Sequence, residues 1–169
     1  SIDQVWRGLN HEENHVELSP VTKTKIIKGA ACAQNRHVFM QLPIPLFDDR
    51  WWITEQNTNI KLEKQSFGKM RELSWKKIPT AQSQEYMNKG LINPSGIEVE
   101  ETRGSWILYE VNVGETIGIY HSFVDPGGYI PVGPVNSLAA GGIWDTITAM
   151  HNYISNIPSS SCHMKKFKK

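Results

Sequence analysis

The sequence lacks several features that would assign a function at once. None of its apolar runs approaches the roughly 20 residues of a membrane-spanning helix. The only two cysteines, Cys32 and Cys162, are far apart and define neither a metal site nor a disulfide framework. The chain also contains no glycine-rich phosphate loop and no internal repeat. These absences argue against a membrane-spanning protein, a small domain held by disulfides and a nucleotide-binding domain.

The charge of the chain is nearly balanced. With 18 Lys and Arg against 17 Asp and Glu, the net charge is +1, so we expect no nucleic-acid partner. Residues 159–169 form a basic tail with four lysines, which leaves the body near −3. A solvated terminus is favoured for this tail, with transient membrane contact as the other option. There is no signal peptide, so a soluble protein of the cytoplasm, or one secreted after signal removal, fits the sequence.

The last third of the chain carries the clearest pattern. Residues 96–102, 105–113 and 116–124 each alternate apolar and polar side chains, as half-buried strands do. Three consecutive strands joined by short loops predict an antiparallel meander. One face of the second strand suits either solvent or a cavity wall with a few polar groups, and consists of Trp106, Leu108, Glu110 and Asn112.

A helical pattern follows the glycines at 127 and 128. Beyond Pro134, which suits a first helical turn, isoleucines and a methionine recur at helical spacing until Pro158. Such a stripe is typical of a face that packs on the core, and part of it could also roof a pocket. The stripe consists of Ile143, Ile147, Met150, Ile154 and Ile157.

The first two thirds of the chain agree with this picture. Residues 1–10 are predicted to form a short helix, with Asp3 as its cap and Val5, Trp6 and Leu9 on one face. Strands are expected at 21–29, 36–41, 51–57, 60–65 and 70–78, and the longest loop at 79–94, with a helical turn near 84–89. The sum is one α+β domain over residues 1–158.

His11-Glu12-Glu13-Asn14-His15 matches the zinc-peptidase motif H-E-x-x-H. In such enzymes the two histidines bind the metal from one helix face and the glutamate polarises the bound water. Neither a buried helix nor a third ligand is evident, and Pro20 ends the segment. We therefore favour a chance match at a helix end or loop, with His11 and His15 as the weaker metal alternative. Neither His121 nor His151 has a serine or cysteine in a nucleophile-elbow context.

Several motifs, in order, resemble the START lipid-transfer domains. The last third of the chain resembles the end of such domains. The similar segments are residues 104–108, the Gly114-Glu115-Thr116 turn, Asp125-Pro126-Gly127-Gly128 through Pro131, and Asn136 before a long helix. Upstream, Pro43-Ile44-Pro45-Leu46 followed by Arg50 is similar to their Pro-x-Pro region. Val5-Trp6 and Leu9 are similar to the first helix of the wider START-like superfamily.

The resemblance implies a helix-grip fold, in which a curved antiparallel sheet wraps a long C-terminal helix around an internal hydrophobic cavity. It also implies a monomer that binds, and could transfer, a lipid or sterol-like small molecule without a cofactor. START-like domains usually begin with a strand, and only Ser1-Ile2 precedes the first helix here. The loop 79–94 would be the lid. The expected cavity-lining residues are Arg50, Trp52, Trp106, Leu108, Glu110, His121, Phe123, Ile143, Ile147 and Met150.

Alternatives stay open at this stage. Arg50 could form a structural salt bridge instead of touching a ligand, with Glu110 as a candidate partner if that carboxylate is buried. Glu110 could equally lie at a rim in solvent. An enzyme on the same fold, of the polyketide cyclase or hydrolase kind, would need His121 or Glu110 in the cavity with polar neighbours.

Overall fold

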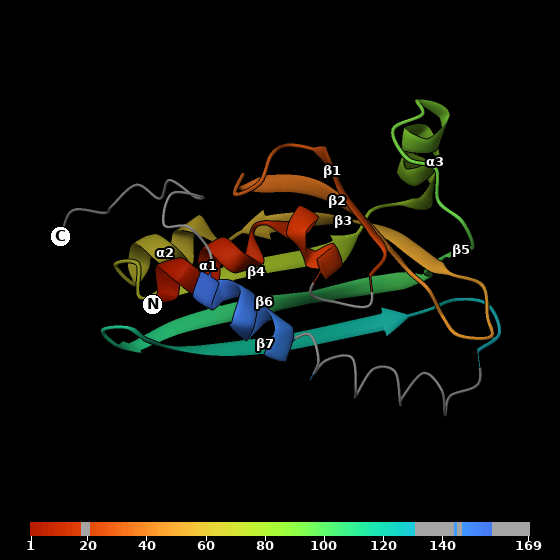
Figure 1. The fold of residues 1–169 in the computed structure, drawn as a ribbon. Coiled ribbons are helices and arrows are strands. Elements are labelled where there is room, and N and C mark those ends of the chain that lie inside the picture. The colour runs from red at the N-terminus through yellow and green to blue at the C-terminus, as the bar shows by residue number, and fades with distance from the viewer. Residues whose placement is uncertain (18–20, 131–143, 145–146, 157–169) are drawn as a thin grey trace.

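Seven strands with helices packed on both faces make up the described part of the chain (Figure 1). The computed structural model describes residues 1–17, 21–130, 144 and 147–156. The strands are β1 (Lys23–Lys28), β2 (Asn35–Leu42), β3 (Arg50–Thr58), β4 (Met70–Lys77), β5 (Ile97–Glu98), β6 (Glu101–Asn112) and β7 (Glu115–Asp125). The helices are α1 (Ile2–Leu9), the 3-10 helix η1 (Glu12–Glu17), α2 (Ile60–Gln65) and α3 (Thr80–Asn88), and residues 147–156 are also helical.

The strands form one sheet in the order β1-β2-β3-β4-β6-β7, with antiparallel neighbours throughout. The short strand β5 lies off this path and pairs in parallel with β3, where Ile97 is opposite Arg50. The expected three-strand meander is therefore only a two-strand hairpin of β6 and β7. The strand expected at 96–102 is divided between β5, which joins β3, and the start of β6.

A bulge sets the register of the β6–β7 hairpin. At the turn, where Gly114 has a φ of +84°, Asn112 is opposite Glu115, but the register shifts between Glu110 and Asn112. One residue of β6 is thereby left without a partner residue on β7. Because side chains alternate between the two faces of the sheet, a shift of one residue changes which β7 side chains share a face with a given β6 side chain.

One face of the sheet, called the inner face here, packs against α1 and the helix at 147–156 (Figure 1). The apolar side of α1 is made by Ile2, Trp6 and Leu9, which are buried with Leu73 of β4 and Leu108 of β6. This confirms the predicted first helix, although its N-cap is Ser1 and Asp3 lies in its first turn.

The helix at 147–156 joins the same cluster. Met150 is buried in it, Tyr153 and Ile154 pack against it, and Gln4 Nε2 donates to the carbonyl of Ile154 at 2.9 Å. The predicted closing helix is thus present and contacts the sheet through its apolar stripe. Ile143, Ile157, Pro134, Asn136 and the tail lie outside the described residues.

The opposite, outer face is covered by α3 over β2 and β3. Tyr86 of α3 is buried with Phe39, Trp51 and Ile53, and its hydroxyl lies 2.8 Å from His37 Nδ1. The segment 79–94, expected to be a loop and a lid, instead begins with a regular helix. Because this helix packs on the outer face, it does not cover the inner one.

The residues expected to form a strand at 60–65 form α2, so that prediction was wrong. Ile60 and Leu62 suggested a period of two, but Asn59 caps a helix here by accepting a hydrogen bond from the Leu62 N–H at 3.0 Å. None of the helices in the described ranges has both the length and the apolar character that a membrane crossing requires.

Candidate ligand-binding face

A row of half-buried apolar side chains crosses the inner face of the sheet. Its members come from five strands, β2, β3, β4, β6 and β7. The register places them on one face, since Met40 is opposite Trp52, Gln56 opposite Trp75, and Trp106 opposite Tyr120. We call them the aromatic row; it comprises Met40, Trp52, Trp75, Trp106 and Tyr120, each partly exposed.

Three rings of the row contact one another. Tyr120 stacks on Trp75 with ring centroids 5.7 Å apart and lies 4.6 Å from the Trp106 ring. Two glycines make room for them: a Cβ on Gly104 would collide with the Trp75 ring, and one on Gly118 would lie 3.8 Å from Trp106. Small residues beside large rings leave a shallow apolar surface that a flat or extended molecule can cover.

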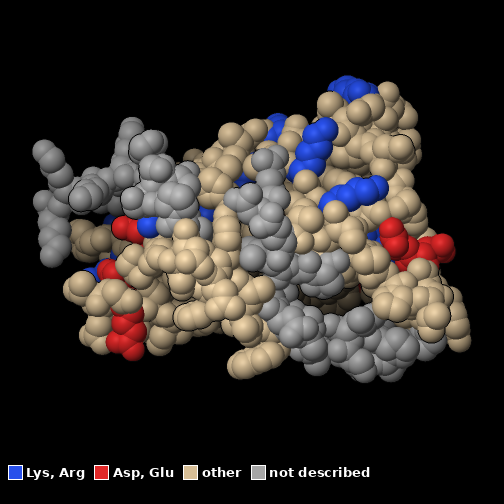
Figure 2. Space-filling view, in the orientation of Figure 1, with Lys and Arg blue, Asp and Glu red and all other residues tan. Residues whose placement is uncertain are grey.

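Figure 2 views the molecule from the side of α1 and the helix at 147–156. The surface is hollowed over the β6 and β7 part of the sheet, and the described atoms visible in the hollow belong to uncharged residues. The charged side chains visible on this side lie away from the hollow, above it and toward the two ends of the molecule. Uncharged described side chains therefore line the visible part of the hollow.

Several expected lining residues lie on or near this face. Trp52 and Trp106 belong to the aromatic row, and Glu110 is half-buried at its β6 end. Leu108 and Met150 are on the inner side but are packed in the core under α1. Ile147 is 40% exposed, so among the described members of the stripe, Ile147, Met150 and Ile154, it has the most room for a ligand.

His121 and Phe123 lie on the opposite face. The bulge in β6 makes Ser105, not Trp106, the partner of His121, and Ser105 Oγ and His121 Nε2 are 2.8 Å apart. Phe123 is exposed, with the Arg103 guanidinium 4.5 Å above its ring. These two residues are therefore removed from the expected lining, and Tyr120 takes the place that His121 was expected to hold.

Arg50 is buried, and its hydrogen bonds go to backbone carbonyls. Its guanidinium donates to the carbonyl oxygens of Asp48 at 2.7 Å, Pro126 at 2.8 Å and Gly127 at 3.1 Å. It thus ties the turn after β7 to the start of β3. Its partners are backbone carbonyls, so the salt bridge considered for Arg50, with Glu110 as the candidate partner, is not formed among the described residues.

The H-E-x-x-H segment has a structural role in place of the zinc geometry. Glu12 is 1% exposed and forms an ion pair with Arg36 of β2, which is fully buried, and Arg36 Nε donates to Glu12 Oε1 at 2.7 Å. His15 Nε2 lies 3.1 Å from the carbonyl oxygen of Gly8. Within the described residues, no three His, Cys, Asp or Glu side chains are placed to hold a metal ion.

Burial lowers the pKa of His15, so the neutral ring donates its Nε2–H to the Gly8 carbonyl. Near His11, Cys32 Sγ is 3.8 Å from His11 Nε2. The other cysteine, Cys162, lies outside the described residues.

A second buried ion-pair group lies at the other end of the inner face. Arg71 of β4 pairs with Asp3 of α1 at 2.5 Å and with Glu63 of α2 at 3.2 Å, and its guanidinium lies 5.9 Å from the Trp6 ring. Burial raises the pKa of Glu63 although Arg71 opposes the shift. This group fastens α1 and α2 to the sheet and leaves the aromatic row between two neutralised charge clusters.

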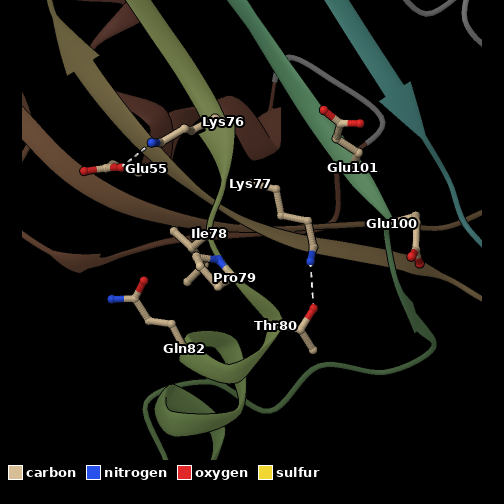
Figure 3. A pocket seen from close by; sticks show the side chains of 9 residues that line it. All are labelled: Glu55, Lys76, Lys77, Ile78, Pro79, Thr80, Gln82, Glu100 and Glu101. Atoms are coloured by element: carbon tan, nitrogen blue, oxygen red, sulfur yellow. Dashed lines mark hydrogen bonds and ion pairs between the residues drawn. The ribbon is translucent and has the colours of Figure 1, made fainter.

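The outer side carries a groove of different character. A hollow of about 430 Å³ runs between α3 and the ends of β4 and β6, as Figure 3 shows. Its walls are mostly charged or polar, and its cations are paired: Lys76 with Glu55 at 3.6 Å and Lys77 with Glu98 at 3.2 Å. An apolar molecule would gain little there, so the inner face is the better candidate site.

The fold has counterparts among solved structures. Human StAR-related lipid transfer protein 5 matches with a TM-score of 0.67 at 11% identity, over 92% of this chain and 70% of that one. The human StarD13 lipid transfer and protein localization domain matches with a TM-score of 0.62 at 14% identity, over 89% and 71% of the two chains. The Zhui aromatase/cyclase from Streptomyces sp. R1128 matches with a TM-score of 0.61 at 9% identity, over 91% and 86%.

The chain therefore has the START-like helix-grip fold, as its motifs suggested. Models of protein families give no match to the sequence, and neither do the sequences of curated proteins. At identities of 9–14% the likeness to solved structures establishes the fold alone.

Proposed function

We propose that this protein binds a hydrophobic small molecule, such as a lipid or sterol-like compound, against the inner face of its sheet. The observation that carries the proposal is the aromatic row, whose rings lie on a concave face between two neutralised charge clusters. The structural likeness to two human lipid-transfer domains supports the same class of ligand.

The energetics of the surface suit this role. Burying apolar area is worth about 25 cal/mol per Å², so covering roughly 300 Å² contributes about 7 kcal/mol before the cost of association. A ligand shielded in this way could be carried through water from one membrane to another. The same shielding would require the protein to touch a membrane only while loading and unloading.

An enzymatic role on this fold is the second candidate, since the Zhui aromatase/cyclase shares it. That role would need an acid or base next to the aromatic row. His121 is on the outer face, bonded to Ser105. Glu110 shares the inner face with Trp106 but lies four residues along β6 from it, beyond the buried Leu108. The described residues that contact the row's rings thus favour binding over acid–base chemistry.

Native mass spectrometry of the purified chain tests the proposal. We expect a bound species of a few hundred daltons that is released by organic solvent and identified in the extract as a hydrophobic molecule. Fully ligand-free protein that also fails to take up sterols, acyl chains or fused aromatic compounds offered in excess would refute it.

A further inference from the structure

Two glutamines are buried in adjacent strands, and they differ in their hydrogen bonds. Gln41 of β2 is 2% exposed; its Nε2 donates to Asp49 Oδ2 at 2.7 Å and to Ser95 Oγ at 2.5 Å, and its Oε1 accepts from the Ser95 N–H at 3.3 Å. Gln56 of β3 is 6% exposed, and among the described residues its buried Oε1 has no hydrogen-bond partner. Buried acceptors in folded proteins are nearly always satisfied, so this exception needs an explanation.

The position of Gln56 supplies one. It lies on the inner face, directly opposite Trp75 of the aromatic row on one side and Arg36 on the other. A second buried acceptor, Glu12 Oε2, also lacks a partner in the described part of the chain, and its carboxylate is held by that same Arg36. Two acceptor oxygens without a described partner thus belong to the side chains next to Arg36, on the β2 side of Trp75. This is where the polar group of a bound molecule would lie.

The charge of that molecule follows from the three arginines that the sheet buries. Arg36 is paired with Glu12 and donates to the Ala33 carbonyl at 3.0 Å. Arg71 is paired with two carboxylates, and Arg50 is bonded to backbone carbonyls. The arginine beside Gln56 is Arg36, whose charge Glu12 already balances. A carboxylate or phosphate brought to this position would therefore lose its hydration without a free counter-charge.

We propose that the inner face selects an uncharged hydrophobic ligand that carries a hydroxyl group, and that this hydroxyl donates a hydrogen bond to the amide of Gln56. The inference rests on the proposed function and narrows its ligand class. An amide side chain both accepts and donates, and a hydroxyl group does the same. A hydrocarbon would leave Gln56 unsatisfied, and an anion would bring acceptors to oxygens that need a donor.

Competition against the neutral dye Nile red tests the ligand class. Three hydrocarbon skeletons are each tested as an alcohol, a hydrocarbon and an anion. The series are cholesterol, 5-cholestene and cholesterol sulfate; 2-naphthol, naphthalene and 2-naphthoate; and dodecanol, dodecane and dodecanoate. For any skeleton that binds, we expect the alcohol to compete about tenfold better than either analogue, which is the worth of one hydrogen bond. A hydrocarbon or an anion that competes equally well would overturn the inference.

The variant Gln56→Leu tests the residue. It replaces an unsatisfied amide by an apolar side chain of similar size, so the melting temperature of the ligand-free protein should stay the same or rise. In this variant the alcohol should compete about as well as its hydrocarbon and anionic analogues. The matched control is Gln41→Leu, which removes a bonded amide on the outer face: it should lower the melting temperature and keep the preference.

The outcomes separate the two proposals. If none of the three skeletons displaces Nile red, or the dye itself does not bind, then the proposed function fails and this inference fails with it. If a skeleton binds but Gln56→Leu keeps the full preference for its alcohol, then only the inference about Gln56 is overturned. The wild-type series decides the ligand class even if a variant does not fold.

Discussion

Replacing Glu12 by glutamine should destabilise the protein strongly, because Glu12 is the counter-charge of a fully buried arginine. Both side chains of the Glu12–Arg36 pair are at most 1% exposed, and the pair joins η1 to β2. Glu12→Gln keeps the shape and the hydrogen-bonding oxygen but leaves the Arg36 charge buried and unpaired. Removing one partner of a buried ion pair costs about 3–5 kcal/mol.

That loss is a large part of the total stability of a domain, which is about 5–15 kcal/mol. With about 2–4 °C per kcal/mol for a domain of this size, the melting temperature should fall by roughly 6–20 °C. Urea unfolding followed by circular dichroism measures the free energy directly. The double variant Glu12→Met with Arg36→Met should recover most of the loss, since apolar side chains can replace a buried pair at little cost.

The matched control is Glu85→Gln. Glu85 pairs with Lys89 at 2.6 Å on the exposed side of α3, and exposed pairs contribute little, so its unfolding midpoint should stay close to that of the wild type. A loss below about 1 kcal/mol for Glu12→Gln would refute the reasoning. It would mean that the carboxylate is not committed to Arg36 and is available for the zinc chemistry that its motif suggests.

Three further predictions follow from the same contacts. Gly104→Ala should cost about 1–3 kcal/mol in urea unfolding, because the new methyl group collides with the His121 carbonyl oxygen and with the Trp75 ring; an unchanged midpoint would contradict this close packing. Arg50→Ala should lower the unfolding free energy by roughly 1–3 kcal/mol, because partly buried carbonyls of the turn after β7 lose their donor. Ligand affinity should change less than twofold; a large loss of affinity at full stability would place this guanidinium at the ligand after all. Burial lowers the pKa values of His15 and His37 below the ordinary 6.5. Above pH 6.5 these histidines are largely neutral in both the folded and the unfolded protein. Below it the unfolded protein takes up protons first, so stability should fall as the pH is lowered from 7 to 5. Unfolding midpoints that rise as the pH is lowered from 7 to 5 would contradict this last prediction.

How far the sequence could predict this structure depended on the scale of the feature. The period-two and helical patterns located α1, most of the sheet strands and the closing helix, because burial on one side imposes a period that a single sequence displays. The strand predicted at 60–65 failed because six residues with two apolar positions fit either period. There the cap formed by Asn59 decided for a helix.

The candidate site was harder to predict because one residue of β6 changes which side chains share a face. A tight turn at Gly114 without a bulge would place Trp106 opposite His121, which is the arrangement that strand parity suggested. The shift between Glu110 and Asn112 moves Tyr120 into that place. Arg50 illustrates a second limit, because its partners are backbone carbonyls and carry no sequence signal.

The most direct test of the central claim compares one large side chain placed on either face of the same strand. Gly118 is on the inner face beside Trp106, and the nearest described atom to a Cβ built there is 3.6 Å away. A side chain at this position therefore begins without a clash, and the ring of Gly118→Phe is expected to cover the aromatic row. The neighbouring Ile119 is 53% exposed on the outer face, so Ile119→Phe is the matched control. Titration with Nile red should show at least a tenfold loss of affinity for Gly118→Phe and wild-type affinity for Ile119→Phe; equal affinities for both folded variants would contradict binding at the inner face.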